Sequence, residues 1–238
     1  MAYDDFRRVV KRWNINNLVK FYDRGEYAEA FRDAGEMYMR PIRSFAFDKS
    51  EQADDEDKQT DDGRCDPYEA LASEIMVESP GKPIFCCTAV GSSGLAAFLS
   101  SADGRRIIKE MAGPNGAAVI IDNPAEWLRR VGKAVPEGFR CGPISYKGDV
   151  FGVKEAMFHP GEKAFLKGSR FAYQHEFRVA LNVDQPLMLE EAGIVDGVPA
   201  QRGRFDPRLL KIGSIADITR VMSADELASF ADVNRAMN

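Results

Sequence analysis

The order of short strand-like and helix-like segments limits the folds open to this chain. Apolar runs of strand length, such as residues 83–90 and 116–122, alternate irregularly with amphipathic stretches that begin with helix-capping residues. Asn123 and Pro124 precede one helical stretch, and Ser223 and Glu226 form a capping-box pattern before another. Because no regular strand–helix–strand repeat runs through the chain, we expect one α+β domain over residues 1–238, with a mixed or split β-sheet core flanked by helices.

The same patterns predict the individual elements. Helical spacing of apolar residues favours helices, and apolar or alternating runs bounded by turn residues favour strands. The expected helices cover residues 3–13, 25–38, 65–79, 94–101, 125–134, 162–168 and 223–233, and the expected strands cover residues 17–22, 83–90, 116–122, 140–146 and 170–182.

One segment, residues 48–62, has a net charge of −6, whereas the whole chain has a net charge of −5. It holds eight acidic residues and two lysines, and Ala53 is its one apolar residue, so it cannot bury apolar surface. We expect a mobile acidic insertion there. The alternative is a docking strip for a basic partner.

Several classes of protein are not indicated. No apolar run is long enough to span a bilayer, and the charged start of the chain does not resemble a secretory signal, so we expect a cytoplasmic protein. Cys65, Cys86, Cys87 and Cys141 lack the spacing of a zinc site or a disulfide framework, so no metal is expected. Phosphate-loop and dinucleotide fingerprints are absent, and the short basic stretches GRRIIK and RLLK offer at most local phosphate contacts.

The predicted strand 170–182 has an unusual polar face. Alternation places Gln174, Glu176 and Arg178 on one face, whereas His175 falls on the apolar face with Phe177. We therefore interpret His175 as a core residue. The polar face is either a solvated sheet surface with ordinary charge pairs or one wall of a cleft.

Five short motifs occur in the order found in a family of bacterial and phage proteins with a domain of unknown function. The family layout runs LYKYR, FNDPFE, FCFS, an apolar strand after glycine, and YExExR. This chain resembles it, from about residue 17 to 185, with LVKFYDRG, CDPYE, IFCCT, GAAVIID, and Lys167 followed by FAYQHEFR. It departs from the layout with Cys65 in place of Asn, Thr88 in place of Ser, and Gln174 in place of Glu.

The layout is also similar to that of the ADP-ribosyltransferase superfamily. The resemblance implies an ADP-ribosyltransferase-like fold with NAD as substrate and Glu176 and Gln174 as catalytic residues. It further implies that the cofactor-binding residues come from Arg24 or Lys20, Tyr22, Thr88 and Arg178. In such enzymes a carboxylate stabilises oxocarbenium character as the nicotinamide–ribose bond breaks.

The resemblance implies transfer to a macromolecular acceptor, protein or nucleic acid, as in a toxin, an antiviral protein or a phage counter-defence effector. Two alternatives remain open. One is a non-catalytic interaction or inhibitor protein on the same fold, with residues 48–62 docking a basic partner. The other is a hydrolase using Cys86 or Cys87, although an apolar strand raises the pKa of a thiol.

Overall fold

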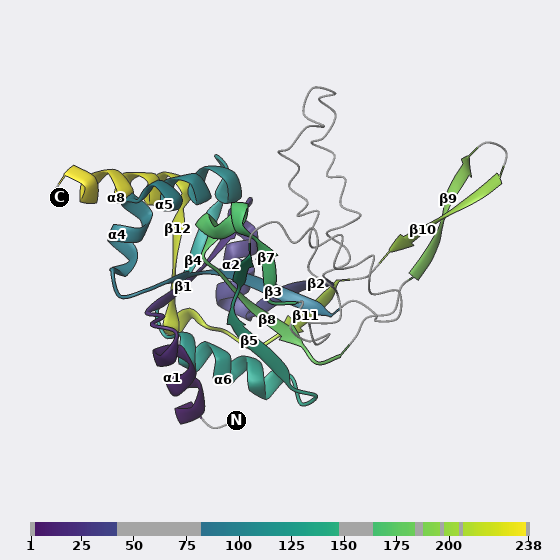
Figure 1. Ribbon diagram of the computed structural model, residues 1–238, viewed down its shortest axis with the longest axis horizontal. Helices are drawn as coiled ribbons and strands as arrows, with labels where there is room; N and C mark the ends of the chain where they lie inside the picture. Colours follow the sequence, from purple (N-terminus) through teal and green to yellow (C-terminus); the bar gives the residue numbers. More distant parts are fainter. Residues whose placement is uncertain are drawn as a thin grey trace.

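A central β-sheet with helices on both faces organises the protein (Figure 1). The computed structural model describes residues 3–41, 82–147, 164–183, 188–195, 198–204 and 207–236. The predicted α+β class is confirmed, and the sheet is mostly antiparallel. Its strands are β1 (Asn17–Tyr22), β2 (Glu36–Pro41), β3 (Pro83–Val90), β4 (Ala117–Ile121), β5 (Phe139–Pro143), β8 (Glu176–Leu181), β11 (Arg208–Lys211) and β12 (Thr219–Ser223).

Strand β3 is the centre of this sheet because it pairs with three other strands. The path runs β11-β2-β3-β1-β4-β12, and β8 pairs with β3 and then with β5. Strand β1 pairs with the end of β3, at Thr88 to Val90, whereas β2 pairs with its beginning, at Pro83 and Ile84. Strands β1 and β2 therefore pair with opposite ends of β3. The helix that connects them, α2 (Gly25–Ala34), packs against β4 and β12.

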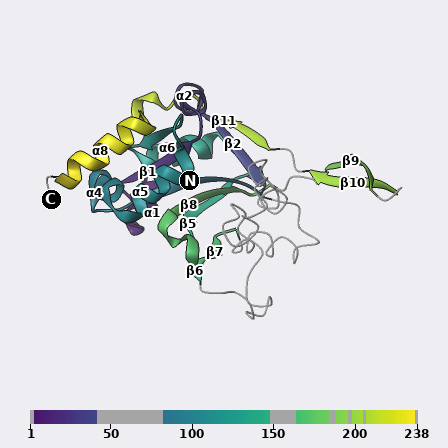
Figure 2. The same ribbon diagram turned by 90° about the horizontal axis from the view of Figure 1, so that it is seen from above.

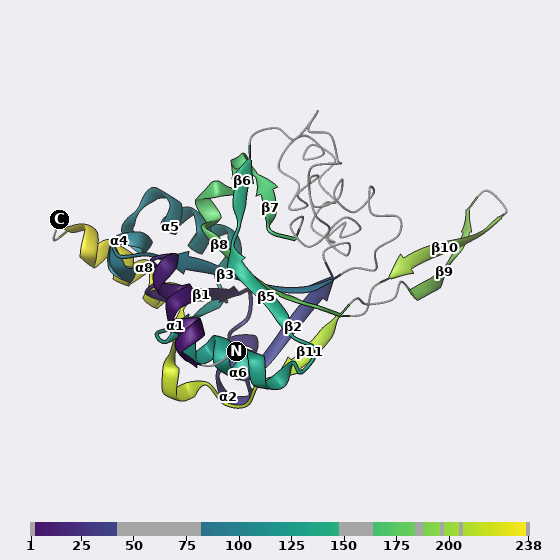
Figure 3. The ribbon, with the colours of Figure 1, turned by 60° about the horizontal axis from the view of Figure 1, so that its bottom comes forward.

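Two groups of helices cover the two faces of the sheet. The side chains of α1 (Tyr3–Arg12), α2 and α6 (Pro124–Ala134) join a core with Phe85, Phe177 and Val179. Helices α4 (Gly94–Ser100), α5 (Ala102–Ile107) and α8 (Ala224–Ala236), with the π-helical turn η3 (Ile108–Ala112), bury the other face. In Figure 3, α1, α2 and α6 lie on one side of the strands, and α4, α5 and α8 gather at one end.

Two small sheets accompany the main one. Strands β6 (Ser145–Lys147) and β7 (Leu166–Gly168) pair in parallel beside the 3₁₀ helix η5 (Ser169–Gln174). Strands β9 (Met188–Val195) and β10 (Val198–Arg204) pair only with each other among the described strands. Figure 2 shows this hairpin extending away from the main sheet.

Several sequence predictions are confirmed at the level of local chemistry. Strand β1 has the predicted bounds, and Asn123 caps α6 by accepting a hydrogen bond from the Glu126 amide. The capping box at α8 is reciprocal: the Ser223 amide donates to the Glu226 carboxylate, and the Glu226 amide donates to the Ser223 hydroxyl.

The predicted helix 25–38 is too long. Helix α2 ends at Ala34, and Gly35 adopts a left-handed conformation with φ of 64° as its C-cap. A Cβ on Gly35 would lie 2.1 Å from the Gly213 carbonyl oxygen, so the close backbone approach also requires glycine. Met37 and Tyr38, which continued the helical stripe in the sequence, belong to strand β2 instead.

The predicted strand 170–182 is wrong over its first half. Residues 169–174 form η5, His175 adopts a left-handed conformation with φ of 44°, and the strand begins at Glu176. The reversal at His175 breaks the alternation on which the assignment of faces depended. The predicted helix 162–168 is also wrong in its described part, because residues 166–168 form β7. The predicted insertion 48–62 and the predicted helix 65–79 with Cys65 lie outside the described residues.

Candidate functional site

The candidate site lies where β3 and β8 run side by side. Thr88 stands opposite Glu176 in the antiparallel register, and Cys86 stands opposite Arg178. Residues directly opposed in such a pair have side chains on the same face of the sheet. All four therefore share one face, while Phe177 joins the core under α6 on the other face.

Buried charges fill this face. The Glu176 Oε1 accepts a hydrogen bond from the Arg178 Nε, and its Oε2 lies 3.0 Å from the Lys167 Nζ. The Arg178 guanidinium also donates to the Ala164 carbonyl oxygen at 2.9 Å. Only 7% of the Glu176 side chain and 1% of the Arg178 side chain are exposed. Both carboxylate oxygens therefore have cationic partners, in a Lys167–Glu176–Arg178 cluster that water barely reaches.

The two cations decide the charge state of Glu176. Burial alone raises the pKa of a carboxyl group, since it disfavours the charged form. For Glu176 this effect is outweighed by the charges of Arg178 and Lys167, which together hold the pKa well below its ordinary value. Glu176 is therefore ionised at neutral pH despite its burial.

Neighbouring groups fix the position of this carboxylate. The Glu176 backbone amide donates to the Tyr146 hydroxyl at 2.7 Å, which ties β6 to the start of β8. Burial raises the pKa of Tyr146 to about 12, so the hydroxyl stays neutral. The Lys167 ammonium lies 4.9 Å from the centre of the Phe171 ring, and Cys86 lies on the same face of the sheet as the Glu176 carboxylate.

Gln174 lies outside the strand, at the end of η5. Its amide donates to the Tyr173 hydroxyl at 3.3 Å, and Tyr173 in turn donates to Glu110 at 2.6 Å. The Arg106 guanidinium lies 3.7 Å from the centre of the Tyr173 ring and donates to Glu110. Gln174 thus belongs to a cluster of polar side chains between η5 and the α5–η3 segment. It precedes Glu176 by two residues but does not lie on the strand face predicted for it.

His175 is not a core residue, so that prediction is wrong. Its side chain is 47% exposed, and its Nε2 lies 3.1 Å from an Asp103 carboxylate oxygen. The left-handed backbone turns the side chain away from the apolar face, and the ring packs edge-on against Phe98. The His175 carbonyl oxygen accepts from the Ala89 amide, which joins η5 to β3.

Lys20 and Tyr22 lie on the opposite face of the sheet from Glu176. The register places Val19 with Thr88, so the side chains of Lys20 and Tyr22 point to the face that carries Phe85. The Lys20 ammonium lies 4.9 Å from the centre of the Phe85 ring. Burial strongly raises the pKa of Tyr22, and its hydroxyl has no hydrogen-bond partner among the described residues.

Arg24 is also remote from Glu176. It lies just before α2, beyond Tyr22, at the end of β1 that is farther from Thr88. Its side chain is 64% exposed, 3.6 Å from the Glu26 carboxylate and over the Tyr27 ring. Of the predicted cofactor-binding residues, the structure therefore brings Thr88 and Arg178 to Glu176, and it does not bring Arg24, Lys20 or Tyr22.

The cysteines of β3 lie on opposite faces, as alternation predicts, with Cys87 buried and Cys86 half-buried. Burial raises the pKa of the Cys87 thiol to about 12, despite the opposing effect of the Lys20 charge. Burial also raises the pKa of Cys86, and the adjacent Glu176 carboxylate raises it further. Both thiols are protonated at neutral pH and are weak nucleophiles.

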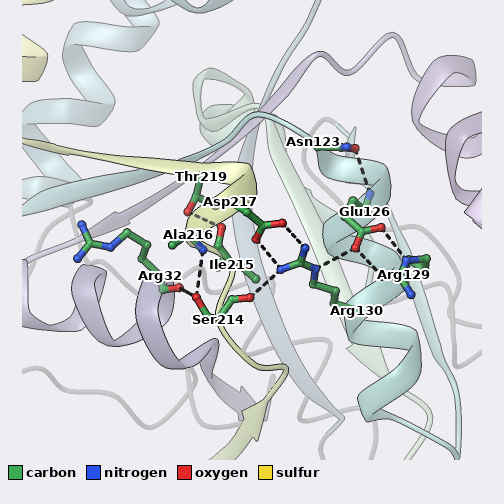
Figure 4. Close-up of polar contacts among 10 residues, drawn as sticks. All are labelled: Arg32, Asn123, Glu126, Arg129, Arg130, Ser214, Ile215, Ala216, Asp217 and Thr219. Atoms are coloured by element: carbon green, nitrogen blue, oxygen red, sulfur yellow. Dashed lines mark hydrogen bonds and ion pairs between the residues drawn. The ribbon is translucent and has the colours of Figure 1, made fainter.

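A separate polar network joins α6 and α2 to the segment before β12. Arg130 of α6 donates to the Ser214 carbonyl oxygen at 2.6 Å and pairs with Asp217 and Glu126, as Figure 4 shows. The Ile215 amide donates to the Arg32 carbonyl oxygen, so the segment before β12 is tied to both α6 and α2. These contacts anchor α6 and contribute no group to the face of Glu176.

Sequence reasoning missed Tyr146, Arg106 and Glu110 as partners of the candidate site. Each lies more than 29 residues from its partner in η5 or β8, so only the folded topology brings them together.

Within the described ranges, no three His, Cys, Asp or Glu side chains gather as metal ligands. None of the described helices has both the length and the apolar character needed to cross a bilayer. Comparison of the chain with protein-family models, curated proteins and solved structures gives no match.

Proposed function

We propose that this protein is an ADP-ribosyltransferase-like enzyme that uses NAD at the face of β3 and β8. The observation that carries the proposal is the pairing of Thr88 with Glu176 across these strands, on one face. The resemblance of the sequence motifs to that superfamily assigns roles to the same two residues. A hydroxyl and an ionised carboxylate in this relation suit the recognition of a ribose.

The charge state of Glu176 supports the proposed chemistry. In the reaction, the bond between the ribose C1′ and the nicotinamide nitrogen breaks, and its electron pair leaves with nicotinamide. Positive charge then develops on the ribose, and a fixed carboxylate stabilises it. The acceptor forms the new bond to C1′ and loses its proton. Glu176 is held ionised by Arg178 and Lys167, so it meets the electrostatic requirement without a change of protonation.

Substrate binding requires one existing contact to change. Glu176 Oε2 is engaged by Lys167, whose side chain is 11% exposed and is the more accessible of the two cationic partners. In the proposed complex a ribose hydroxyl replaces the Lys167 ammonium at this oxygen, while Arg178 retains the other oxygen. The released ammonium is then available to the pyrophosphate of NAD.

A second function, a non-catalytic interaction protein on the same fold, is favoured by the same cluster. Both oxygens of Glu176 already have partners, and the side chain is nearly inaccessible. If the cluster only stabilises the fold, Glu176 contributes to folding and to no reaction. The macromolecular partner would then bind elsewhere on the surface.

The release of nicotinamide from NAD, and the transfer of labelled ADP-ribose to added protein or nucleic acid, separate these functions. The informative variant is Thr88→Val, which keeps the shape of a buried side chain and removes its hydroxyl. The matched control is Thr219→Val on strand β12. It also removes a threonine hydroxyl, one that donates a hydrogen bond to the Ile215 carbonyl oxygen. The enzyme proposal expects turnover that Thr88→Val lowers by about tenfold or more and that the control leaves nearly unchanged. No turnover by the folded wild-type protein with any acceptor class would favour the interaction protein.

A further inference from the structure

Most basic side chains in the two stretches singled out in the sequence are neutralised within the fold. In GRRIIK, Arg106 pairs with Glu110 at 2.8 Å. In RLLK, Arg208 lies 2.7 Å from Glu137, and Lys211 lies 2.7 Å from Glu36. Cations that already have carboxylate partners attract an external polyanion weakly, so Arg106, Arg208 and Lys211 are poor phosphate contacts.

Helix α1 differs in this respect. Arg8, Lys11 and Arg12 are exposed, and none of the three has an ion-pair or hydrogen-bond partner among the described residues. Their spacing of three and four residues places them along one side of the helix. Among the described residues, their charges therefore lie on one surface without a paired carboxylate.

This side of α1 borders a groove. The groove has a volume of about 840 Å³ and runs between α1, the turn at Asn14 to Asn16, and the first turn of α6. Figure 3 shows α1 and α6 next to each other on this side of the sheet. The residues lining it are Arg7, Arg8, Val10, Lys11, Asn14, Ile15, Asn16, Asn123, Pro124 and Ala125.

The other wall of the groove also favours anions. It is the N-terminal turn of α6, an eleven-residue helix, where the positive end of the helix dipole lies and where the acidic Glu126 is already paired with Arg129 and Arg130. The turn opposite is held in place by two side-chain amides. That of Asn14 donates to the Ser92 hydroxyl, and that of Asn16 donates to the Gly91 carbonyl oxygen. Cations, amides and a helix start thus meet in one groove with a defined shape.

The shape of the groove favours a polymer over a small enclosed ligand. Its cationic residues are exposed on the outer wall, whereas Ile15, Pro124 and Ala125 form a buried floor. A small anion would remain open to solvent in such a groove, but a strand can lie along it. Arginine and lysine side chains one helical turn apart suit the repeating phosphates of a nucleic acid strand.

We infer that the groove between α1 and the start of α6 binds the phosphate backbone of a single nucleic acid strand, with Arg8 and Lys11 as principal contacts. This surface lies at the same end of the sheet as Glu176. The Asn16 backbone amide donates to the carbonyl oxygen of Val90, which lies two residues beyond Thr88. The Trp13 ring packs edge-on against Phe177. Binding at this groove does not depend on the proposed reaction.

Fluorescence anisotropy with a labelled single-stranded oligonucleotide, DNA and RNA in turn, tests the inference across a series of salt concentrations. The double variant Arg8→Ala, Lys11→Ala is compared with Lys109→Ala, Lys133→Ala, which removes two exposed lysines elsewhere. We expect the groove variant to weaken binding by about tenfold and to reduce the slope of log affinity against log salt by about 0.7 for each removed cation. The control variant should bind like the wild type.

Three results would overturn the inference. One is the absence of saturable binding by the wild-type protein at low salt. Another is an equal loss in both double variants, which would indicate attraction to overall charge without a defined groove. The third is competition by polyglutamate as strong as by unlabelled oligonucleotide, which would assign the groove to an acidic protein. Circular dichroism establishes that each variant is folded, so a loss of binding can be interpreted.

Discussion

The replacement Glu176→Gln tests the buried charge cluster, because it keeps the size of the side chain and removes only its charge. From the sequence alone, with Glu176 on an open strand face, the variant would be expected to fold normally. In the structure, the change removes the carboxylate that pairs with the Arg178 guanidinium and the Lys167 ammonium, which are 1% and 11% exposed. Breaking a buried ion pair by removing one partner costs about 3–5 kcal/mol.

The expected result is a loss of this size in the free energy of unfolding at neutral pH. For a chain of this length, it corresponds to a fall of about 6–20 °C in the melting temperature. Urea denaturation followed by tryptophan fluorescence measures the free energy directly. A matched control is Glu26→Gln, which removes a carboxylate that is 67% exposed and lies 3.6 Å from Arg24. This control should change the stability by less than about 1 kcal/mol.

The pH dependence gives a second measure of the same effect. The folded pKa of Glu176 is lowered from its ordinary value of 4.5, so the carboxylate contributes stability above that value and loses it as the pH falls through the folded pKa. The difference between wild type and Glu176→Gln should therefore be largest at neutral pH and should narrow below about pH 4.

Adding Arg178→Met to the Glu176→Gln variant should recover part of the loss, since it removes the buried cation that was paired with the lost carboxylate. If Glu176→Gln destabilised the protein no more than Glu26→Gln, at every pH, the reasoning about the cluster would be refuted.

Three further predictions concern the fold around the site. Cys87 should resist alkylation in the native protein and react only on unfolding, because its buried thiol has a pKa of about 12; rapid labelling of Cys87 in mass spectra of native protein would contradict its burial. Gly35→Ala should lower the free energy of unfolding by more than about 1 kcal/mol, through its positive φ and the Gly213 carbonyl oxygen, and an unchanged urea midpoint would refute this. His175→Gly should change that free energy by less than about 1 kcal/mol, since an exposed residue with φ of 44° tolerates glycine, and a loss typical of a core cavity would instead support the sequence-based interpretation.

The elements that could be predicted from the sequence are those whose signals are local. A capping residue acts on an amide three positions away, so Asn123 and Ser223 revealed the starts of α6 and α8. The alternation of β3 likewise separated Cys86 from Cys87 correctly. These patterns depend on neighbours in the chain and not on the topology.

The candidate site could be predicted only in part, because its geometry depends on one backbone turn and on contacts between distant segments. The left-handed turn at His175 has no signature in FAYQHEFR, and it removed Gln174 from the strand. The faces of Lys20 and Glu176 depend on the register of β1 and β8 against β3, which hydrophobicity does not specify for half-polar strands. The charge of Glu176 was anticipated, but its burial with Lys167 and Arg178 was not.

Calorimetric titration of the wild-type protein with NAD tests the central proposal most directly, since it requires neither a known acceptor nor turnover. The proposal predicts saturable heat with a stoichiometry near one, and a binding free energy that Thr88→Val weakens by about 1 kcal/mol or more through the lost hydroxyl contact. Thr219→Val should titrate like the wild type. Heats that stay at the level of dilution up to millimolar NAD, from a protein shown to be folded, would contradict the proposal that the face of Thr88 and Glu176 binds this substrate.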